Sequence, residues 1–539
     1  MLVLGLIALP ARGQLRFLPP VEEPSIESVD GFLRRAEKLE TERRWGEALS
    51  VYEDALREHP EEPTLGDRHT LAKIHYDLGR RYSDSSYLRN LSTLSDRQAL
   101  SLYSEVLVKI ESHYVSNPDW NGLVARGTRG LAVALRDPAF HKQNLRGASS
   151  EQCDAVIAQL RQLSQTRPVQ SRQQAVDFAS TAANLARQQL QIAPTAVIFE
   201  YSCGAIGALD SYSSYLTSDQ LNDVYSQIEG NFVGLGIELK ANRGALEIVK
   251  VITGSPADRA GIHAGDRINE VDGKNTSELS TDQAADLLQG QEGSLVQIAI
   301  STPDNRVRRL TIRREHVEVP SVDDVKIIDR DYGVGYLKLT CFQKTTSRDL
   351  DAALWKLHRE GMKSLIMDLR GNPGGLLTSS VEVADKFVDD GVIVSTRGRS
   401  PLEDFNYTAH KPGTWRMPLV VLIDGESASA SEIFAGAIKD HRRGNLVGQR
   451  SYGKGSVQGI FPLSVAGSGV RLTTAKFYSP HGHPISHVGV QPDLVVRKTA
   501  KPVAQVATAS HGADEVLEAG VQAAKRQMAK PSTSGQVQR

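Results

Sequence analysis

The sequence contains few cysteines, no excess of charge of either sign and no long hydrophobic run. Its 539 residues include three cysteines (Cys153, Cys203 and Cys341) with no CxxC spacing. They fit neither a disulfide framework nor a cysteine zinc site. We interpret them as small buried residues, with a Cys153–Cys203 disulfide as the alternative. The formal net charge of −1 provides no basic surface that would indicate nucleic acid or an anionic membrane as a partner.

The N-terminus carries a short apolar run, MLVLGLIALPARGQ, ending in small residues and Arg12. Residues 1–13 resemble the apolar part of an export signal with cleavage near Gly13, although the basic residues that usually precede it are missing. The run is too short to cross a bilayer, which needs about 20 residues. A mis-assigned start or a buried strand at the N-terminus is the alternative.

The composition, with 40% hydrophobic and 24% charged residues, is typical of globular proteins, and the length predicts two to four domains. Apolar residues at helical spacing predict a helical hairpin over 31–90. Its stretch WGEALSVYEDALREHPEEP resembles one tetratricopeptide helix pair, whereas an array needs about three. We therefore expect either an ordinary hairpin or a small interaction module. Residues 94–229 continue helical, with a Gln/Ala-rich block near 145–200.

The pattern changes sharply at residue 230. Short β segments separated by Gly/Asp turns fill 230–316. Strands and helices then alternate over 320–497, which predicts an α/β domain with buried strands in one sheet. Residues 498–539 predict a linker, a short helix over 513–528 and a disordered tail.

The stretch from Val420 to Gln458 carries the clearest chemistry. A buried apolar run leads into GESASASEIF, where a serine cluster opens an amphipathic helix, and SYGKGSVQ then sets Lys454 between two glycines. Hydrolysis by a serine and a lysine needs a serine near helix N-terminal amides. It also needs a lysine desolvated enough to be a neutral amine, because an exposed lysine, with a pKa of about 10.4, is no base at neutral pH.

The 230–316 region resembles a PDZ domain of the bacterial type. The stretches that carry this resemblance are GLGIEL (234–239) and GSPADRAGIHAGDRINEVDG (254–273). Such domains bind an extended C-terminal peptide by strand addition and hold its carboxylate on backbone N–H groups. The resemblance places this loop at Val233 to Ile237, where glycines permit close backbone approach. The peptide-binding residues it implies are Gly234, Leu235, Gly236, Ile237, Ala284, Leu287 and Leu288. The alternative is that these are core residues of a small β domain.

The segments 94–230 and 332–497 resemble the C-terminal processing peptidases, serine endopeptidases with a Ser/Lys dyad and an inserted PDZ domain. In order along the chain, the motifs are ALDSYSSYL, the PDZ sequence, MDLRGNPGGLL, DGESASASEIFAGAIKDH, VGQRSYGKGSVQ, RLTTAKFYSPHG and VGVQPD. The fold class implied is an α/β peptidase core with an inserted β-rich PDZ domain and an α-helical N-terminal region. The block near 145–200 and the N-terminal hairpin are additions to the family pattern. In the glycine loop, where the family often has Thr-Phe, this chain has Ser451-Tyr452.

The resemblance implies the roles of the site residues. Composition leaves Ser427, Ser429 and Ser431 equivalent as nucleophiles; the family pattern selects Ser429, with Lys454 as general base. Gln458 is implied to hydrogen-bond Lys454 and orient it. The implied oxyanion hole uses backbone N–H groups of Ala430 and of Gly374 or Gly375, a choice that the sequence leaves open.

Three nearby acidic and basic residues receive more modest roles. We expect Asp368 and Arg370 to end a buried strand and hold the glycine turn. Glu432, on the helix that follows Ser429, either contacts the catalytic loop or is a first-turn acid favoured by the helix dipole.

A Ser-His-Asp site is the main chemical alternative, because His441 follows the serine cluster and His481, His483 and His487 come later. The absence of a G-x-S-x-G turn argues against it, as does the position of His441 about three turns along the helix. The two histidines of HGH also lack metal-ligand spacing. We expect no cofactor and no metal.

We therefore predict a serine endopeptidase that captures protein C-termini through its PDZ domain and cleaves through an acyl-enzyme. A further hypothesis is that binding of a peptide to the PDZ domain switches the catalytic site on. The partners implied are protein substrates with exposed C-termini, an adaptor at the N-terminal helices and a second copy of the chain, and the location implied is periplasm or cell envelope. The alternatives are a PDZ/helical scaffold without turnover, a protease gated by an adaptor, and a hydrolase of non-protein acyl substrates.

Overall fold

The computed structural model describes residues 27–145, 147–242, 245–276, 287–304, 306–410, 414–496 and 514–529. The predicted export signal, the linker after residue 497 and the polar tail lie outside these residues. The chain divides into two compact units, residues 1–83 and 84–539.

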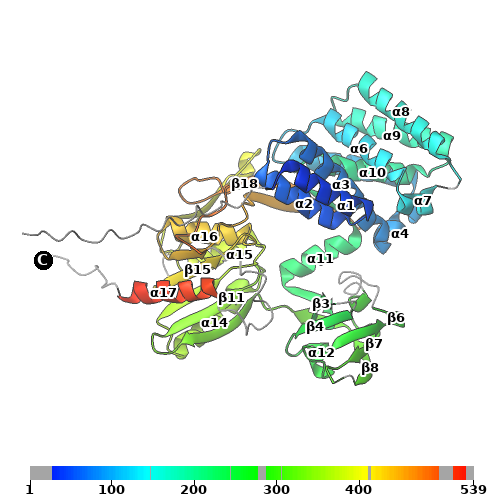
Figure 1. Ribbon diagram of the computed structural model, residues 1–539. Helices are drawn as coiled ribbons and strands as arrows, with labels where there is room; N and C mark the ends of the chain where they lie inside the picture. The colour runs from blue at the N-terminus through cyan, green and yellow to red at the C-terminus, as the bar shows by residue number, and fades with distance from the viewer. Residues whose placement is uncertain are drawn as a thin grey trace, which may run out of the picture. The chain divides into compact units, whose positions relative to one another are not determined.

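The described residues of the first unit form three helices instead of the predicted hairpin: α1 (Val29–Thr41), α2 (Trp45–Glu58) and α3 (Pro63–Ser83) (Figure 1). Its core is formed by small and aromatic side chains that include Phe32, Ala48 and Tyr52. The unit ends at residue 83, not 90, because the next helix, α4 (Ser85–Thr93), belongs to the second unit.

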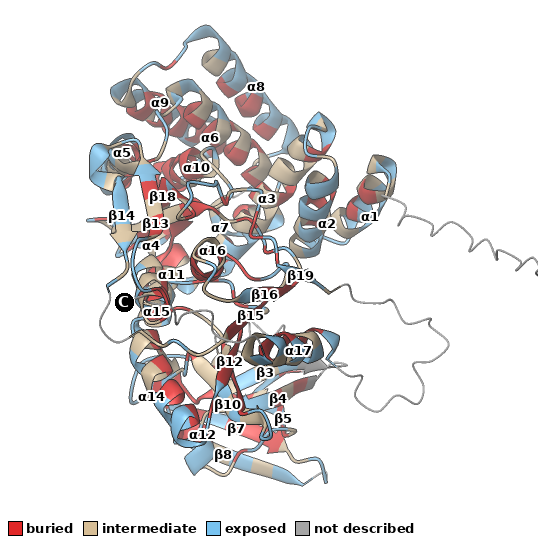
Figure 2. Cartoon of the chain, turned by 90° about the vertical axis from the view of Figure 1, so that its left-hand side faces the viewer, coloured by how far each residue is buried: buried red, intermediate tan, exposed pale blue. Residues whose placement is uncertain are grey.

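The second unit begins with a helical region that includes most of the block near 145–200. Its central helix α10 (Pro194–Gly207) is buried along most of its length (Figure 2). Gly127 and Gly204 permit its close packing on α6, since a Cβ on Gly204 would lie 2.5 Å from the Gly127 Cα. The other helices are α5 (Asp96–His113), α6 (Trp120–Ala134), α7 (Pro138–Asn144), α8 (Ser150–Thr166), α9 (Arg172–Leu190) and α11 (Ser218–Glu229).

A small antiparallel sheet follows, with its own apolar core. Its strand order is β3-β4-β5-β7-β8, so β3 lies at an edge. The strands are β3 (Ile237–Asn242), β4 (Ala245–Val251), β5 (Arg267–Val271), β6 (Lys274–Asn275), β7 (Leu295–Ser301) and β8 (Val307–Arg313), with the short helix α12 (Pro256–Arg259). A separate two-stranded ribbon, β2 (Asn231–Gly234) with β9 (Glu315–Glu318), connects this domain to its neighbours in the chain.

The α/β core is a six-stranded sheet in the order β10-β11-β12-β15-β16-β19, parallel from β11 onward. One face packs on α14, α15 and α16, and the other packs on α17. The elements are β10 (Val322–Asp329), β11 (Val334–Leu339), α14 (Thr346–Arg359), β12 (Ser364–Asp368), α15 (Leu377–Asp385), β15 (Leu419–Ile423), α16 (Ala430–Asp440), β16 (Asn445–Gly448), β19 (Leu494–Val495) and α17 (Glu515–Ala529).

A second sheet joins the helical region to the core. It has the order β1-β18-β13-β14, with β17 also pairing with β18. The strands are β1 (Ser214–Leu216), β13 (Val392–Gly398), β14 (Phe405–Thr408), β17 (Ser456–Pro462) and β18 (Gly469–Tyr478); the one-turn helix η1 (Pro401–Glu403) precedes β14. The pair Ser214↔Arg471 brings the ALDSYSSYL segment beside the strands that follow Lys454. None of the helices described is both long and apolar enough to cross a membrane.

Candidate active site

Ser429 lies at a sharp turn between the buried strand β15 and helix α16. Its φ of 54° and ψ of −113° are unusual for a residue with a side chain, and such a conformation costs about 1–3 kcal/mol. The flanking serines are buried: Ser427 Oγ donates to the Leu369 carbonyl at 2.8 Å and Ser431 Oγ to the Asn372 carbonyl at 3.0 Å. Ser429 is thus the partly exposed serine of the three.

The buried carboxylate of Glu432 joins the serine turn to the lysine loop. Its Oε2 accepts from the backbone N–H of Ser429 and of Lys454, both at 2.8 Å. Its Oε1 accepts from Ser451 Oγ at 2.6 Å and from the Gly453 N–H at 2.7 Å. Burial raises the pKa of Glu432, and these donated bonds act in the opposite direction. Glu432 therefore contacts the loop that carries Lys454 and is also an acidic residue in the first turn of α16, so the structure bears out both interpretations of this residue.

The Lys454 side chain is half-buried. Burial lowers the pKa of its amine, and Arg471 nearby lowers this pKa further, while Glu432 and Asp210 act against the shift. The backbone of its loop is held tightly, because a Cβ on Gly455 would lie 2.3 Å from the Ser486 nitrogen. Among the described contacts, no hydrogen bond joins the Ser429 and Lys454 side chains; such contacts often tighten only when substrate binds.

Gln458 differs from the sequence-based expectation. Its amide nitrogen donates to Ser456 Oγ at 3.0 Å and to Thr473 Oγ1 at 3.2 Å. No bond to Lys454 is present in the described part of the chain. The pairing of β17 with β18 shifts between Val457 and Gln458, and the amide is engaged by its neighbours on these two strands.

The RGNPGG turn (370–375) packs directly against Ser429. A Cβ on Gly374, where φ is 102°, would lie 2.7 Å from the Ala428 oxygen and 2.8 Å from Ser429 Cβ. The Gly374 N–H already donates to Asn372 Oδ1 at 2.9 Å. By contrast, the N–H groups of Gly375 and Ala430 have no acceptor among the described residues. These two are the donors left available for an oxyanion.

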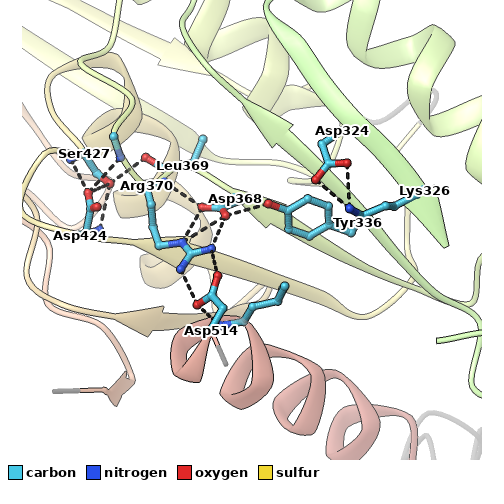
Figure 3. Close-up of polar contacts among 11 residues, drawn as sticks. Asp324, Lys326, Tyr336, Asp368, Leu369, Arg370, Asp424, Ser427 and Asp514 are labelled. Carbon is cyan, nitrogen blue, oxygen red and sulfur yellow. Dashed lines mark hydrogen bonds and ion pairs between the residues drawn. The ribbon is translucent and has the colours of Figure 1, made fainter. Parts of the chain in front are cut away.

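Behind this turn, Arg370 links the end of β12 to the C-terminal helix (Figure 3). Its guanidinium pairs with the buried Asp368 at 2.6 Å and with Asp514, just before α17, at 2.8 Å. Tyr336 also donates to Asp368, at 2.9 Å. The arrangement fits the structural role expected for Asp368 and Arg370. No pattern in the sequence indicates that Asp514 takes part.

The PDZ loop presents backbone donors beside an edge strand. The N–H groups of Leu235 and Gly236 have no acceptor among the described residues. The Leu235 and Leu288 side chains lie in the domain core, whereas Ile237 and Leu287 are half-buried against it. Gly234 is buried in β2, and Ala284 lies outside the described residues.

Tyr212 is a site residue that the sequence analysis missed. The Lys454 Nζ lies 5.0 Å from the centroid of its ring. The ALDSYSSYL motif contains Tyr212, but its spacing does not indicate which of its side chains lies beside the lysine. His441, the alternative base, instead hydrogen-bonds the Val392 carbonyl at 2.7 Å.

The fold and site define a serine-type peptidase with an inserted PDZ domain, and comparison with known proteins agrees. Residues 333–496 match the model of peptidase family S41, and 247–302 match a PDZ domain model. The carboxy-terminal-processing protease of Bartonella bacilliformis is 39% identical over 302 residues, which are 55% of this chain and 68% of that protein. The carboxyl-terminal-processing protease of Synechocystis is 32% identical, over 60% of this chain and 77% of its own length.

The chain belongs to peptidase family S41, with the carboxyl-terminal-processing proteases. A solved structure of the photosystem II D1 C-terminal processing protease is 26% identical, covers 74% of this chain and 93% of that chain, and has a TM-score of 0.39.

Proposed function

We propose that this peptidase captures protein C-termini through its PDZ domain and cleaves the bound chain with Ser429 and Lys454 through an acyl-enzyme. The observation that carries the proposal is the Glu432 carboxylate, which accepts from the backbone of both residues at 2.8 Å. A single buried group thereby fixes the nucleophile turn against the lysine loop. Preorganisation of this kind is a main source of catalytic power.

The chemistry follows from the lowered pKa of Lys454. The neutral amine takes the Ser429 Oγ proton while Oγ bonds to the scissile carbonyl carbon. The resulting oxyanion accepts from the N–H groups of Gly375 and Ala430. The Lys454 ammonium then gives its proton to the leaving amine as the C–N bond breaks. In the second half, Lys454 takes a proton from the attacking water as its oxygen bonds to the acyl carbon. The Lys454 ammonium then returns that proton to Ser429 Oγ as the bond between Oγ and the acyl carbon breaks, which releases a carboxylic acid and restores the serine hydroxyl.

The PDZ domain supports the substrate class. The Leu235 and Gly236 N–H groups, which have no acceptor among the described residues, suit a terminal carboxylate. Strand β3 lies at an edge of the sheet formed by the described strands and suits the addition of a peptide strand. The half-buried Ile237 and Leu287 favour an apolar last side chain. A protein with an exposed apolar C-terminus is therefore the substrate that we expect.

The test is cleavage of an unfolded protein with an apolar or a charged C-terminus. Ser429→Ala and Lys454→Ala should each lose about 10³-fold or more in kcat, while Lys476→Ala, an exposed lysine on β18, serves as the matched control. A fluorophosphonate probe should label the wild type and spare Ser429→Ala. Cleavage by Ser429→Ala at the wild-type rate would contradict the proposal, as would a wild type that binds peptide but never cuts.

A further inference from the structure

The environment of Lys454 contains a group that the proposed chemistry has not used. The ring of Tyr212 lies under its Nζ at 5.0 Å, within the roughly 6 Å over which a cation is attracted to an aromatic face. The charged groups around the amine are Arg471 on β18, Glu432 on α16 and Asp210, two residues before Tyr212. The ring is thus one of several groups that act on the protonated amine.

Tyr212 is held in this position by a well-defined turn. The Asp210 Oδ1 accepts from the N–H of Tyr212 at 2.8 Å and of Ser213 at 2.7 Å. Burial raises the pKa of Tyr114, which follows α5, and the nearby Asp210 raises it further. These contacts fix the backbone on both sides of the tyrosine.

Strand β18 also hydrogen-bonds the segment that carries Tyr212. The Thr473 N–H donates to Ser213 Oγ at 3.3 Å, and the Arg471 guanidinium donates to Ser214 Oγ at 3.1 Å. The Val115 N–H, after α5, donates to the Thr473 carbonyl at 2.8 Å. The helical region and the peptidase core therefore meet at the residue that touches Lys454.

We infer that Tyr212 is a positioning residue for Lys454, whose ring face holds the amine in place and stabilises its protonated form during turnover. This inference rests on the proposed function. A lysine base must accept a proton and return it. Burial and Arg471 both oppose protonation, and a carboxylate paired with the amine would raise its pKa by about 1–3 units, too far for a base at neutral pH. A ring face provides a smaller stabilisation and cannot accept the proton.

The magnitude of a cation–π contact corresponds to about half to one and a half pH units. Removing the ring should therefore lower the pKa of Lys454 further. The acid limb of the kcat/KM profile reports the protonation of the free-enzyme base, so it should move to lower pH by this amount. The plateau of kcat should fall about 10-fold, because a weaker and less fixed base transfers the proton more slowly, while KM stays the same.

The experiment compares the full-length wild type with Tyr212→Leu and Tyr212→Phe, using pH profiles of kcat and KM. Tyr212→Phe keeps the ring and should keep the acid limb of the wild type, whereas Tyr212→Leu should shift it. Tyr225→Leu, a tyrosine on α11 that is 40% exposed, is the matched control. An unshifted limb in Tyr212→Leu overturns the inference, as does a Tyr212→Phe variant as impaired as Tyr212→Leu.

Fluorinated phenylalanines at position 212 provide a second test that does not depend on the folding of Tyr212→Leu. Successive fluorines withdraw electron density from the ring face with little change in shape, so the acid limb should move stepwise to lower pH. A limb that stays in place across the series overturns the inference. Lys454→Ala separates the two proposals: if it remains active, the lysine base itself is wrong, and if it is inactive while the series shows no shift, only the role of Tyr212 is wrong.

Discussion

The catalytic core and the PDZ domain hold their functional groups in different ways. In the core, the loops that carry Ser429 and Lys454 are bonded to one carboxylate that is fully buried. In the PDZ domain, the candidate binding groups are half-buried side chains at an edge strand and amides without an acceptor among the described residues.

This difference follows from what each region has to do. Bond cleavage gains from donors and bases fixed in advance, because reorganisation during the reaction slows it. Capture of many C-terminal sequences gains from an edge strand, where backbone bonds supply affinity and shallow pockets supply a preference. We therefore expect substitutions in the core to lower kcat steeply and substitutions in the PDZ pocket to change KM.

Among the substitutions that compare the two regions, the largest effect is expected from Glu432→Gln. The side-chain amide would turn an NH₂ toward two of the four donors that now point at the carboxylate, so the serine turn and the lysine loop would separate. We expect kcat to fall about 10²–10³-fold and the free energy of unfolding to fall by about 1–3 kcal/mol. Steady-state kinetics and thermal unfolding measure the two effects.

The control for Glu432→Gln is Glu426→Gln, an exposed glutamate in the same turn region. It should resemble the wild type in both measurements. If Glu432→Gln kept the wild-type kcat, Glu432 would be only a buried residue of the helix start, and the core would not depend on the link it provides.

A somewhat smaller effect is expected from Gly374→Ala. The new methyl would lie 2.7 Å from the Ala428 oxygen and 2.8 Å from the Ala430 nitrogen, so the nucleophile turn must shift. We expect about a 10²-fold loss in kcat, since small displacements at a reacting centre are costly. Pre-steady-state kinetics should show that acylation is the step that slows.

Gly371→Ala separates this effect from backbone strain. Gly371 also has a positive φ, of 73°, but the nearest atom to its added Cβ is Glu426 Oε2 at 3.5 Å. This variant should lose about 1 kcal/mol of stability and keep its kcat. Equal losses of kcat in the two variants would show that strain in the turn, not contact with Ser429, is responsible.

Patterns in the sequence predicted many of the helices and strands of the core but fewer of the hydrogen bonds between its residues. The alternation of strands and helices over 320–497 and the apolar run before the serine cluster predicted the buried sheet and the strand-to-helix turn at Ser429. The motif order predicted the family. The sequence could not choose between Gly374 and Gly375, because that choice depends on which N–H is already bonded within the turn, and here Asn372 takes that of Gly374.

The residues that were missed are those brought in by tertiary contacts between distant segments. Tyr212 reaches Lys454 only because β1 pairs with β18, and Asp514 reaches Arg370 only because α17 packs across the sheet. The amide nitrogen of Gln458 bonds Ser456 and Thr473 for a related reason, since strand pairing sets its neighbours. The third helix of the first unit was missed because the comparison with a two-helix repeat suggested a pair.

The smallest effect is expected from Ile237→Ser in the PDZ domain. This substitution also tests the contrast between the two regions most directly. Ile237 is half-buried where β3 begins, so a polar side chain should weaken capture of apolar C-termini. We expect KM for a substrate with an apolar end to rise about 10-fold, with kcat within about 2-fold, and little change for a charged end. Loss of about 1.4 kcal/mol of binding gives this factor.

Leu295→Ser is the matched control, because Leu295 is 58% exposed on β7, away from the β3 edge. Both variants should be compared at equal folded fraction. A fall in kcat without a rise in KM for Ile237→Ser would mean that the PDZ domain switches the catalytic site, as the gating hypothesis holds, and does more than deliver substrate to it. The ratio of the two kinetic effects therefore decides whether binding and catalysis are separable in this chain.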